Sequence, residues 1–178
     1  VWITDTVGVQ ALWVGAWAPL GVVLVADRLS ALMLTVASLV TLAVLIYATG
    51  QDEEEVLRET PVSIFHPTFL LLSAGVSDAF LAGDLFNLFV GFELLLFASY
   101  VLLTMGGTAQ RISAGSIYVV INLVSSLLFL TTLAVIYAAT GTVNMAQLSL
   151  RFAALPADVT LPMQLLLLVV FAIKAAVF

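Results

Sequence analysis

The stretch "GDLFNLFVGFELLLFASYVLLT", residues 83–104, decides how the rest of the chain is interpreted. From Leu85 to Thr104 it is apolar over 20 residues, which is the length a helix needs to cross the hydrocarbon core of a bilayer. One residue, Glu93, does not fit, because it places a carboxyl group near the middle of that span. A charge at this depth is costly and usually functional, so the stretch predicts both a transmembrane helix and a candidate site.

The composition supports a membrane protein with several spans. Of 178 residues, 63% are hydrophobic and only 9% are charged, whereas soluble domains have about 25% charged residues. There are no cysteines and a single histidine, His66, which excludes disulfides, thiolate-bound metals and a bis-histidine haem or zinc site within this chain. The five Lys and Arg residues are scattered and the net charge is −6, so nucleic acid is not an expected partner. We predict no cofactor and no metal.

The apolar stretches predict an all-α polytopic membrane protein with five spans. Their approximate ranges are 29–49, 64–82, 85–104, 112–139 and 161–178, the last one truncated. Only Gly83 and Asp84 separate the second and third spans, which must therefore form a tight antiparallel hairpin. The chain begins without Met and stops inside an apolar run, so we expect it to be a piece of a longer protein, with residues 28–178 forming a helix bundle.

The segments outside the spans differ in character. Residues 1–27 are broken by Gly and Pro, and Trp13 and Trp17 suit a membrane interface; we expect Val9–Val14 to pair with Gly21–Val25 as a hairpin. Residues 51–59 predict a solvated acidic loop, and residues 140–160 a connection with room for one short amphipathic helix. The arginines divide two against two between the sides, so charge does not fix the orientation.

Two buried charges stand out, Glu93 in the third span and Lys174 in the fifth. They have opposite sign and similar expected depth, and neither has a charged neighbour in sequence, so we expect them to pair. One interpretation is a static ion pair that fixes two helices together. The other is a proton relay, because intramembrane acids and bases mark conduction paths and the pKa of a lysine changes with burial and with the distance of a carboxylate.

Further polar residues are candidates for the same path or for helix packing. Tyr100 lies two turns beyond Glu93, where it could join a water chain or sit at the interface. Asn122, Ser125 and Ser126 cluster on one face of the fourth span, a pattern typical of helix association that is also compatible with a hydrated path.

The remaining acids and the histidine have simpler interpretations. Asp78 is a third candidate, just inside the end of the second span. Asp84 and Asp27 each precede a helix, where a carboxylate caps the first turn. His66 precedes Pro67 at the entry of the second span and is more typical of an interfacial residue than of a relay.

These residues resemble the D-type membrane component of Mrp-type Na+/H+ antiporters, which is related to the antiporter-like membrane subunits of respiratory complex I. The similarity rests on the stretch quoted above and on "VADRLSALM" (25–33), "INLVSSLLF" (121–129), "GTVNMAQLS" (141–149) and "FAIKAAVF" (171–178). It covers nearly the whole chain. The family usually has Asn, Gly and Thr at the positions of Ser77, Asp78 and Ala82.

The resemblance implies more than the residues do. Members have about 14 transmembrane helices, in which Glu93 would match the buried glutamate of the fifth and Lys174 the lysine of the seventh, on a proton path. It places residues 1–27 and 140–160 outside the cell and residues 50–63 and 105–112 in the cytoplasm. The expected partners are the other subunits of a hetero-oligomeric complex in the bacterial cytoplasmic membrane, with membrane lipid, H+ and Na+.

We therefore expect a secondary ion transporter subunit, not an enzyme, that translocates protons through Glu93 and Lys174 in exchange for Na+. The alternative on the same fold is a proton-pumping subunit of a redox complex of the complex I or membrane-bound hydrogenase type. An alternative of another class is a structural membrane subunit whose ion pair is static. Neither cation selectivity nor stoichiometry follows from the sequence.

Overall fold

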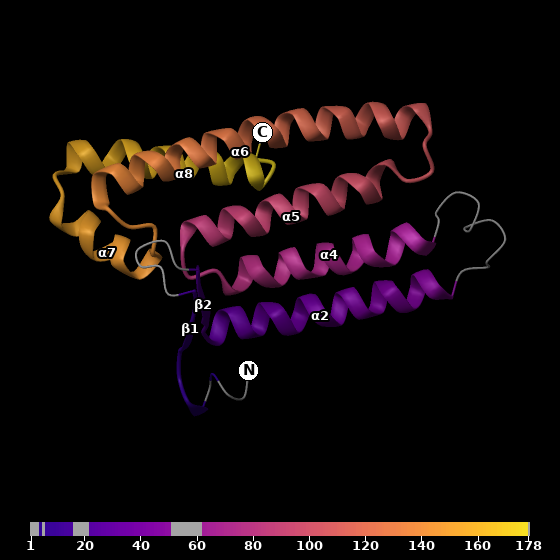
Figure 1. Cartoon of the computed structure of the whole chain (residues 1–178), viewed down its shortest axis with the longest axis horizontal. Helices are drawn as coiled ribbons and strands as arrows, with labels where there is room; N and C mark the ends of the chain where they lie inside the picture. The colour runs from indigo at the N-terminus through magenta and orange to yellow at the C-terminus, as the bar shows by residue number, and fades with distance from the viewer. Residues whose placement is uncertain (1–3, 5, 16–21, 51–61, 178) are drawn as a thin grey trace.

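In a computed structural model of the chain, five long helices follow a small β-hairpin (Figure 1). The structure describes residue 4, residues 6–15, residues 22–50 and residues 62–177. The elements in chain order are β1 (Gln10–Val14), β2 (Val22–Ala26), α2 (Arg28–Thr49), α4 (Val62–Leu81), α5 (Leu85–Thr104), α6 (Ala109–Thr140), α7 (Met145–Ala154) and α8 (Ala157–Lys174). All except β1, β2 and α7 are long and apolar enough to cross a membrane, which confirms the predicted fold class.

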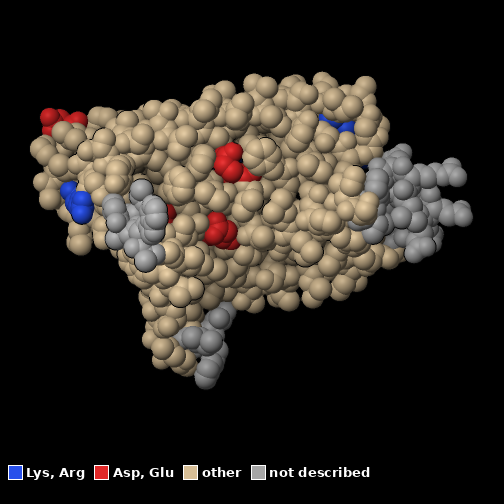
Figure 2. Space-filling view, viewed as in Figure 1, with Lys and Arg blue, Asp and Glu red and all other residues tan. Residues whose placement is uncertain are grey.

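The helices run back and forth along one direction, with α4 packed between α2 and α5, and α6 packed against α5 and α8 (Figure 1). The β-hairpin, the α4–α5 turn and α7 lie together at one end of the bundle, and the α5–α6 turn lies at the other. The expected loop at 51–59 is outside the described residues. The face shown in Figure 2 carries few acidic or basic side chains, as a surface in contact with lipid requires.

The α4–α5 turn forms the tight antiparallel hairpin that the sequence predicts. It needs glycine at position 83, because a Cβ there would lie 2.6 Å from Cγ2 of Val25 and 2.9 Å from the carbonyl oxygen of Val23. The N–H of Gly83 donates to that same carbonyl at 2.7 Å, and its own carbonyl accepts from the N–H of Met145 at 3.1 Å. The turn is thereby joined to β2 on one side and to the start of α7 on the other.

The two strands pair antiparallel, with Gln10 opposite Ala26 and Val14 opposite Val22. This is the hairpin predicted for the N-terminal segment, with β1 beginning one residue later than expected and β2 displaced by one residue. Of the residues used for that prediction, Trp13 is exposed on β1, while Trp17 and Gly21 are outside the described residues.

Both predicted aspartate caps are present at helix starts. Asp84 caps α5 by accepting from the N–H of Asn87 at 2.7 Å, and its second oxygen accepts from the N–H of Val23 at 2.9 Å. Asp27 caps α2 in a reciprocal box, in which its carboxylate accepts from the N–H of Ser30 and its own N–H donates to the Ser30 hydroxyl. The bond from the Ser30 N–H is the main reason why the pKa of Asp27 lies below its usual value.

The limits of α8 differ from the predicted span, because its first turn includes polar residues that the apolar pattern left out. The fifth span was expected at 161–178, whereas α8 begins at Ala157 and ends at Lys174. Apolar length locates the lipid-crossing part only, and Asp158 in the first turn of α8 favours a helix start through the helix dipole. Within 140–160 the structure has one short helix, α7, as the sequence allowed.

The buried apolar side chains gather among α5, α6, α7 and α8. Phe129, Ile136 and Val170 are fully buried there. Together with Leu85, Leu133, Val143, Leu148 and Met163 they form one cluster. The core is therefore formed partly by α5 and α8, the helices that carry Glu93 and Lys174. In contrast, α2 exposes many large apolar side chains.

Candidate functional site

Three polar residues from three helices meet beside this core: Glu93 of α5, Ser126 of α6 and Lys174 of α8. The Lys174 Nζ lies 4.0 Å from Oε1 of Glu93 and donates to the Ser126 hydroxyl at 3.1 Å. The same hydroxyl donates to Oε1 of Glu93. The predicted pairing of Glu93 with Lys174 is thus present in the structure, with Ser126 as a bridge between them.

The site is largely enclosed by protein. Lys174 has 9% of its side chain exposed and Glu93 has 21%, and Ser126 is buried. Rings line one side: Phe171 and Phe92 pack edge to face with centroids 6.5 Å apart, and the Lys174 Nζ lies 5.7 Å from the centroid of Phe92. A cation over an aromatic face is stabilised without water, so the rings hold the lysine head while excluding solvent.

The other polar residues predicted on α5 and α6 do not join this cluster. Asn122 donates to the carbonyl of Tyr118 in its own helix at 2.9 Å. Ser125 is fully buried, and its hydroxyl has no hydrogen-bond partner among the described residues. Tyr100 lies beside Gly115, where a Cβ would be 3.3 Å from its ring. Of the three candidates on α6, only Ser126 reaches the ion pair.

A second polar contact between α5 and α6 was not predicted. The hydroxyls of Ser99 and Tyr118 lie 2.8 Å apart, between the ion pair and the α5–α6 turn. Ser99 is six residues beyond Glu93, or about 9 Å along the helix at 1.5 Å per residue. Its position in an apolar run was the available signal, but the partner on α6 depends on tertiary packing.

Asp78 and His66 lie away from the ion pair. Asp78 accepts from the side-chain amide of Asn87 at 3.0 Å, across the α4–α5 interface. His66 packs against Phe65 near the start of α4, with ring centroids 5.5 Å apart. The structure therefore separates both residues from Glu93.

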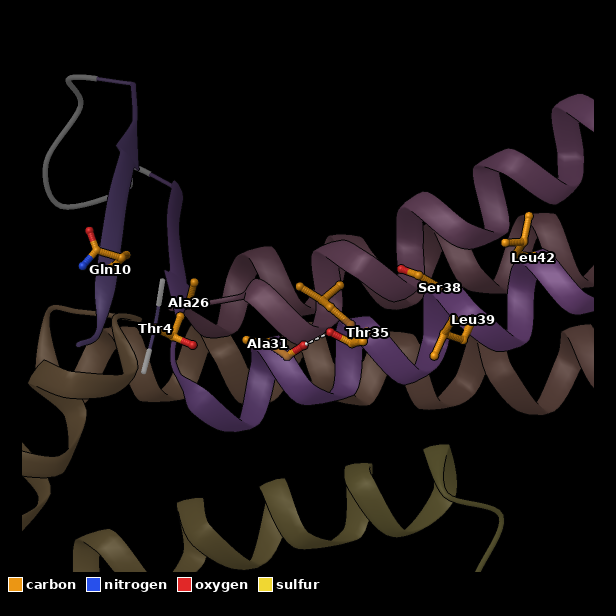
Figure 3. A pocket seen from close by; sticks show the side chains of 9 residues that line it. Thr4, Gln10, Ala26, Ala31, Thr35, Ser38, Leu39 and Leu42 are labelled. Carbon is orange, nitrogen blue, oxygen red and sulfur yellow. Dashed lines mark hydrogen bonds between the residues drawn. The ribbon is translucent and has the colours of Figure 1, made fainter. Parts of the chain in front are cut away.

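No group of three or more acidic, histidine or cysteine side chains suited to a metal occurs in the part of the chain that the structure describes. A shallow groove lies where the hairpin meets α2 (Figure 3). It is lined by Thr4, Gln10, Ala26, Ala31, Leu34, Thr35, Ser38, Leu39 and Leu42. This lining contains no charged side chain, and the groove is separate from the ion pair.

The arrangement can move a proton between two fixed ends. The hydrogen bonds run in one direction, from the Lys174 ammonium to the Ser126 hydroxyl and from that hydroxyl to the Glu93 carboxylate. A concerted shift along them converts ammonium, hydroxyl and carboxylate into amine, hydroxyl and carboxylic acid. Net charge and atoms balance, and no group has to move far.

Comparison with protein families gives a match over residues 82–178 to the model described as "NADH:quinone oxidoreductase/Mrp antiporter, TM". The chain is 42% identical over 173 residues to the D-type component of the Na+/H+ antiporter of Alkalihalophilus pseudofirmus, covering 96% of this chain and 34% of that relative. It is 49% identical over 142 residues to the D-type component of a probable K+/H+ antiporter of Rhizobium meliloti, covering 79% of this chain and 25% of the relative. The chain thus spans about a third or less of these relatives.

Two solved structures share the fold. A chain of the Mrp complex from Dietzia sp. DQ12-45-1b is 35% identical with a TM-score of 0.75, over 98% of this chain and 32% of that one. A chain of the membrane-bound sulfane sulfur reductase, an archaeal respiratory membrane complex, is 31% identical with a TM-score of 0.65, over 83% of this chain and 28% of that one.

Proposed function

Because the chain belongs to the NADH:quinone oxidoreductase/Mrp antiporter transmembrane family, we propose that it is part of a membrane subunit of a multi-subunit cation/proton antiporter. In this proposal Glu93 and Lys174 carry protons across the membrane in exchange for Na+. The other subunits of the complex are its partners, and residues 1–27 and 140–160 face the outside of the cell. The observation that carries the proposal is the Glu93–Ser126–Lys174 cluster.

The proton step follows from the charges and distances of the cluster. Two unit charges 4 Å apart attract by about 4 kcal/mol at an effective dielectric constant of about 20, and the two side chains are 4.0 Å apart. The nearby carboxylate therefore stabilises the protonated lysine. When a proton or cation neutralises Glu93, that attraction is lost. Because 1.36 kcal/mol corresponds to a factor of ten, the loss of about 4 kcal/mol lowers the proton affinity of Lys174 by up to about a thousandfold.

Ser126 gives the proton of Lys174 a route to Glu93 while Glu93 is still ionised. Its hydroxyl is the hydrogen-bonded link between the two charges, so the proton need not cross the open distance between Nζ and Oε1. The aromatic rings beside Lys174 limit the competing route through bulk water. A static ion pair would need the charges but not a bridging hydroxyl that both donates and accepts.

The test is Glu93→Gln in the complete subunit within its complex, measured as Na+-dependent pH change in everted vesicles. The amide keeps the shape and removes the charge, so antiport should be abolished or severely reduced while native gels still show assembly. Glu93→Asp should retain part of the activity. The matched control is Asp158→Asn, which likewise replaces a carboxylate by its amide, at an exposed position in the first turn of α8. This variant should transport like the wild type. Full antiport by an assembled Glu93→Gln complex would make the ion pair a packing element.

A second candidate function rests on the fold shared with the archaeal respiratory membrane complex. There the same cluster would translocate protons driven by a redox reaction of partner subunits. Purification of the complex from its source distinguishes the two: iron–sulfur partner subunits would favour the redox pump, and their absence together with Na+-dependent activity would favour the antiporter.

A further inference from the structure

A second carboxyl group, that of the half-buried Asp78 on α4, lies at the contact between α4 and α5. One of its oxygens, Oδ1, accepts from the Asn87 amide at 3.0 Å. The other oxygen, Oδ2, is buried and has no hydrogen-bond partner among the described residues. Buried polar atoms normally have partners, so this oxygen needs an explanation.

The surroundings of Asp78 are close and rigid. Oδ2 lies against the backbone of α5 at Gly91, where a Cβ would be only 3.0 Å away. Across the same contact, a Cβ on Gly75 would lie 3.1 Å from the Leu95 nitrogen and 3.2 Å from the Gly91 carbonyl oxygen. The two glycines let the helices approach closely, and Asn87 has only 5% of its surface exposed. Water therefore has little access to Oδ2 from this side.

Asp78 of α4 contacts one face of α5, and Glu93 projects from the opposite face. Gly91, which touches Asp78, precedes Glu93 by two residues, and at 3.6 residues per turn this separates them by about 200° around the axis. Glu93 points to α6 and α8, whereas Asp78 approaches from α4. The two carboxyl groups therefore do not share a hydrogen-bond network in the described part of the chain.

Among the described residues, the charged and titratable groups around Asp78 give it no counter-ion. The elements packed against α4 contribute Glu93 and Tyr100 of α5, Arg28 and Tyr47 at the two ends of α2, and Asp84 at the turn, and α4 itself carries His66. Of these, Asp84 brings a like charge near Asp78. Each oxygen of the Asp84 carboxyl group accepts from a backbone N–H group. A buried carboxylate next to another negative charge is unfavourable, and protonation removes the cost.

We propose that Asp78 is a second proton-binding site, which takes H+ on Oδ2 while Oδ1 keeps its hydrogen bond to Asn87. The ligand is a proton from water, and its binding is independent of the Glu93–Lys174 pair. The site does not rest on the antiport assignment, because a carboxyl group binds its proton whether or not the subunit exchanges cations.

The experiment is infrared difference spectroscopy on the purified full-length subunit in its complex, with H2O exchanged for D2O. The wild type should show a carboxylic acid C=O band that shifts on deuteration, disappears as the pH rises, and is absent in Asp78→Asn. The matched control is Glu93→Gln, which should keep this band with the same titration. Absence of the Asp78 band across the pH range would mean that the group is ionised and would overturn the proposal.

Two further measurements test the chemistry of the site. Asn87→Leu removes the N–H that stabilises the anion, so the band should persist to a pH about one unit higher; an unchanged titration would contradict the role given to Asn87. Addition of Na+ at fixed pH should leave the band unchanged. If Na+ removes the band in the wild type, the site binds a cation in place of the proton, and the proposal of a dedicated proton site is wrong.

Discussion

Carboxyl groups lie at two opposite faces of α5 in contrasting settings, Glu93 of α5 itself and Asp78 of the neighbouring α4. Glu93 faces α6 and α8, where a hydroxyl and an ammonium contact it. Asp78 approaches the other face, where it has a single amide donor and no described cation as partner. The difference teaches that burial alone does not decide what a membrane carboxyl group does. Glu93 has a counter-ion 4.0 Å away, whereas Asp78 has none among the described residues, and this contrast is the basis of the second proton site proposed for Asp78.

The largest effect on antiport should come from a change to Lys174, the counter-ion that Glu93 has and Asp78 lacks. Lys174→Arg keeps the positive charge, but a guanidinium effectively never releases its proton. If the lysine is a proton carrier, antiport should fall at least about 100-fold, the usual scale of a lost acid–base group, as measured by Na+-dependent pH change in everted vesicles. The control is Arg111→Lys, which exchanges the same two residue types in the first turn of α6. Near-normal transport by Lys174→Arg would reduce the ion pair to a static contact.

The bridging hydroxyl can be tested against its own neighbour. Ser126→Ala removes a hydrogen bond to each charged group, and such bonds are worth about 1.5–3 kcal/mol. Transport should therefore fall about tenfold or more in the same assay. Ser125→Ala deletes an equally buried hydroxyl that has no described partner and should change the rate by less than about twofold. Equal rates for the two variants would argue against a route through Ser126.

The free energy of unfolding should also differ between variants of Glu93 and of Asp78, but by a smaller factor than transport does. Glu93→Gln leaves Lys174 without its counter-ion, and breaking a buried pair typically costs about 3–5 kcal/mol. Deprotonation of Lys174 relieves part of this cost, so the variant should lose about 2–3 kcal/mol of unfolding free energy. Asp78→Asn removes no ion pair and should cost about 1 kcal/mol or less. Thermal unfolding of the complex in detergent measures both, and a larger loss for Asp78→Asn would reverse the comparison.

The smallest expected effect on stability is that of Asp27, an exposed carboxylate that serves as the reference for Glu93 and Asp78. Its pKa is lowered in the folded chain, chiefly by the bond from the Ser30 N–H. The stabilisation is therefore complete above the unfolded pKa of about 3.9 and is lost as the pH falls through the lower folded value. The difference in unfolding midpoint between the wild type and Asp27→Asn should be constant near neutral pH and should change only in acid. A difference that changes around pH 7 would point to another group.

The sequence predicted the features that depend on local pattern and failed on those that depend on packing. Apolar length identified all five long helices, and two residues between spans identified the α4–α5 hairpin. The caps at Asp27 and Asp84 followed from their positions before helices. In the site, opposite charges at similar depth indicated that Glu93 and Lys174 would meet.

Other features could not be derived from spacing along one helix. The choice of Ser126 over Ser125 and Asn122 depends on the rotation of α6 against α5 and α8. The Ser99–Tyr118 contact joins α5 and α6, whose register is set by side-chain packing. The Asp78–Asn87 contact joins α4 and α5, which approach closely at Gly75 and Gly91. Among these residues, Asp78, Asn122, Ser125 and Ser126 were candidates from the sequence, whereas Ser99, Tyr118 and Asn87 were not singled out.

The central claim is that the Glu93 carboxylate sets the proton affinity of Lys174. It is tested most directly by 15N NMR titration of the Lys174 side chain in the full-length subunit, compared between the wild type and Glu93→Gln. We predict that removal of the carboxylate lowers the proton affinity of Lys174 by at least about tenfold and by up to about a thousandfold. Ser125→Ala should leave the titration unchanged. An identical titration in the wild type and Glu93→Gln would contradict the account, because the carboxylate would then exert no control over the proton.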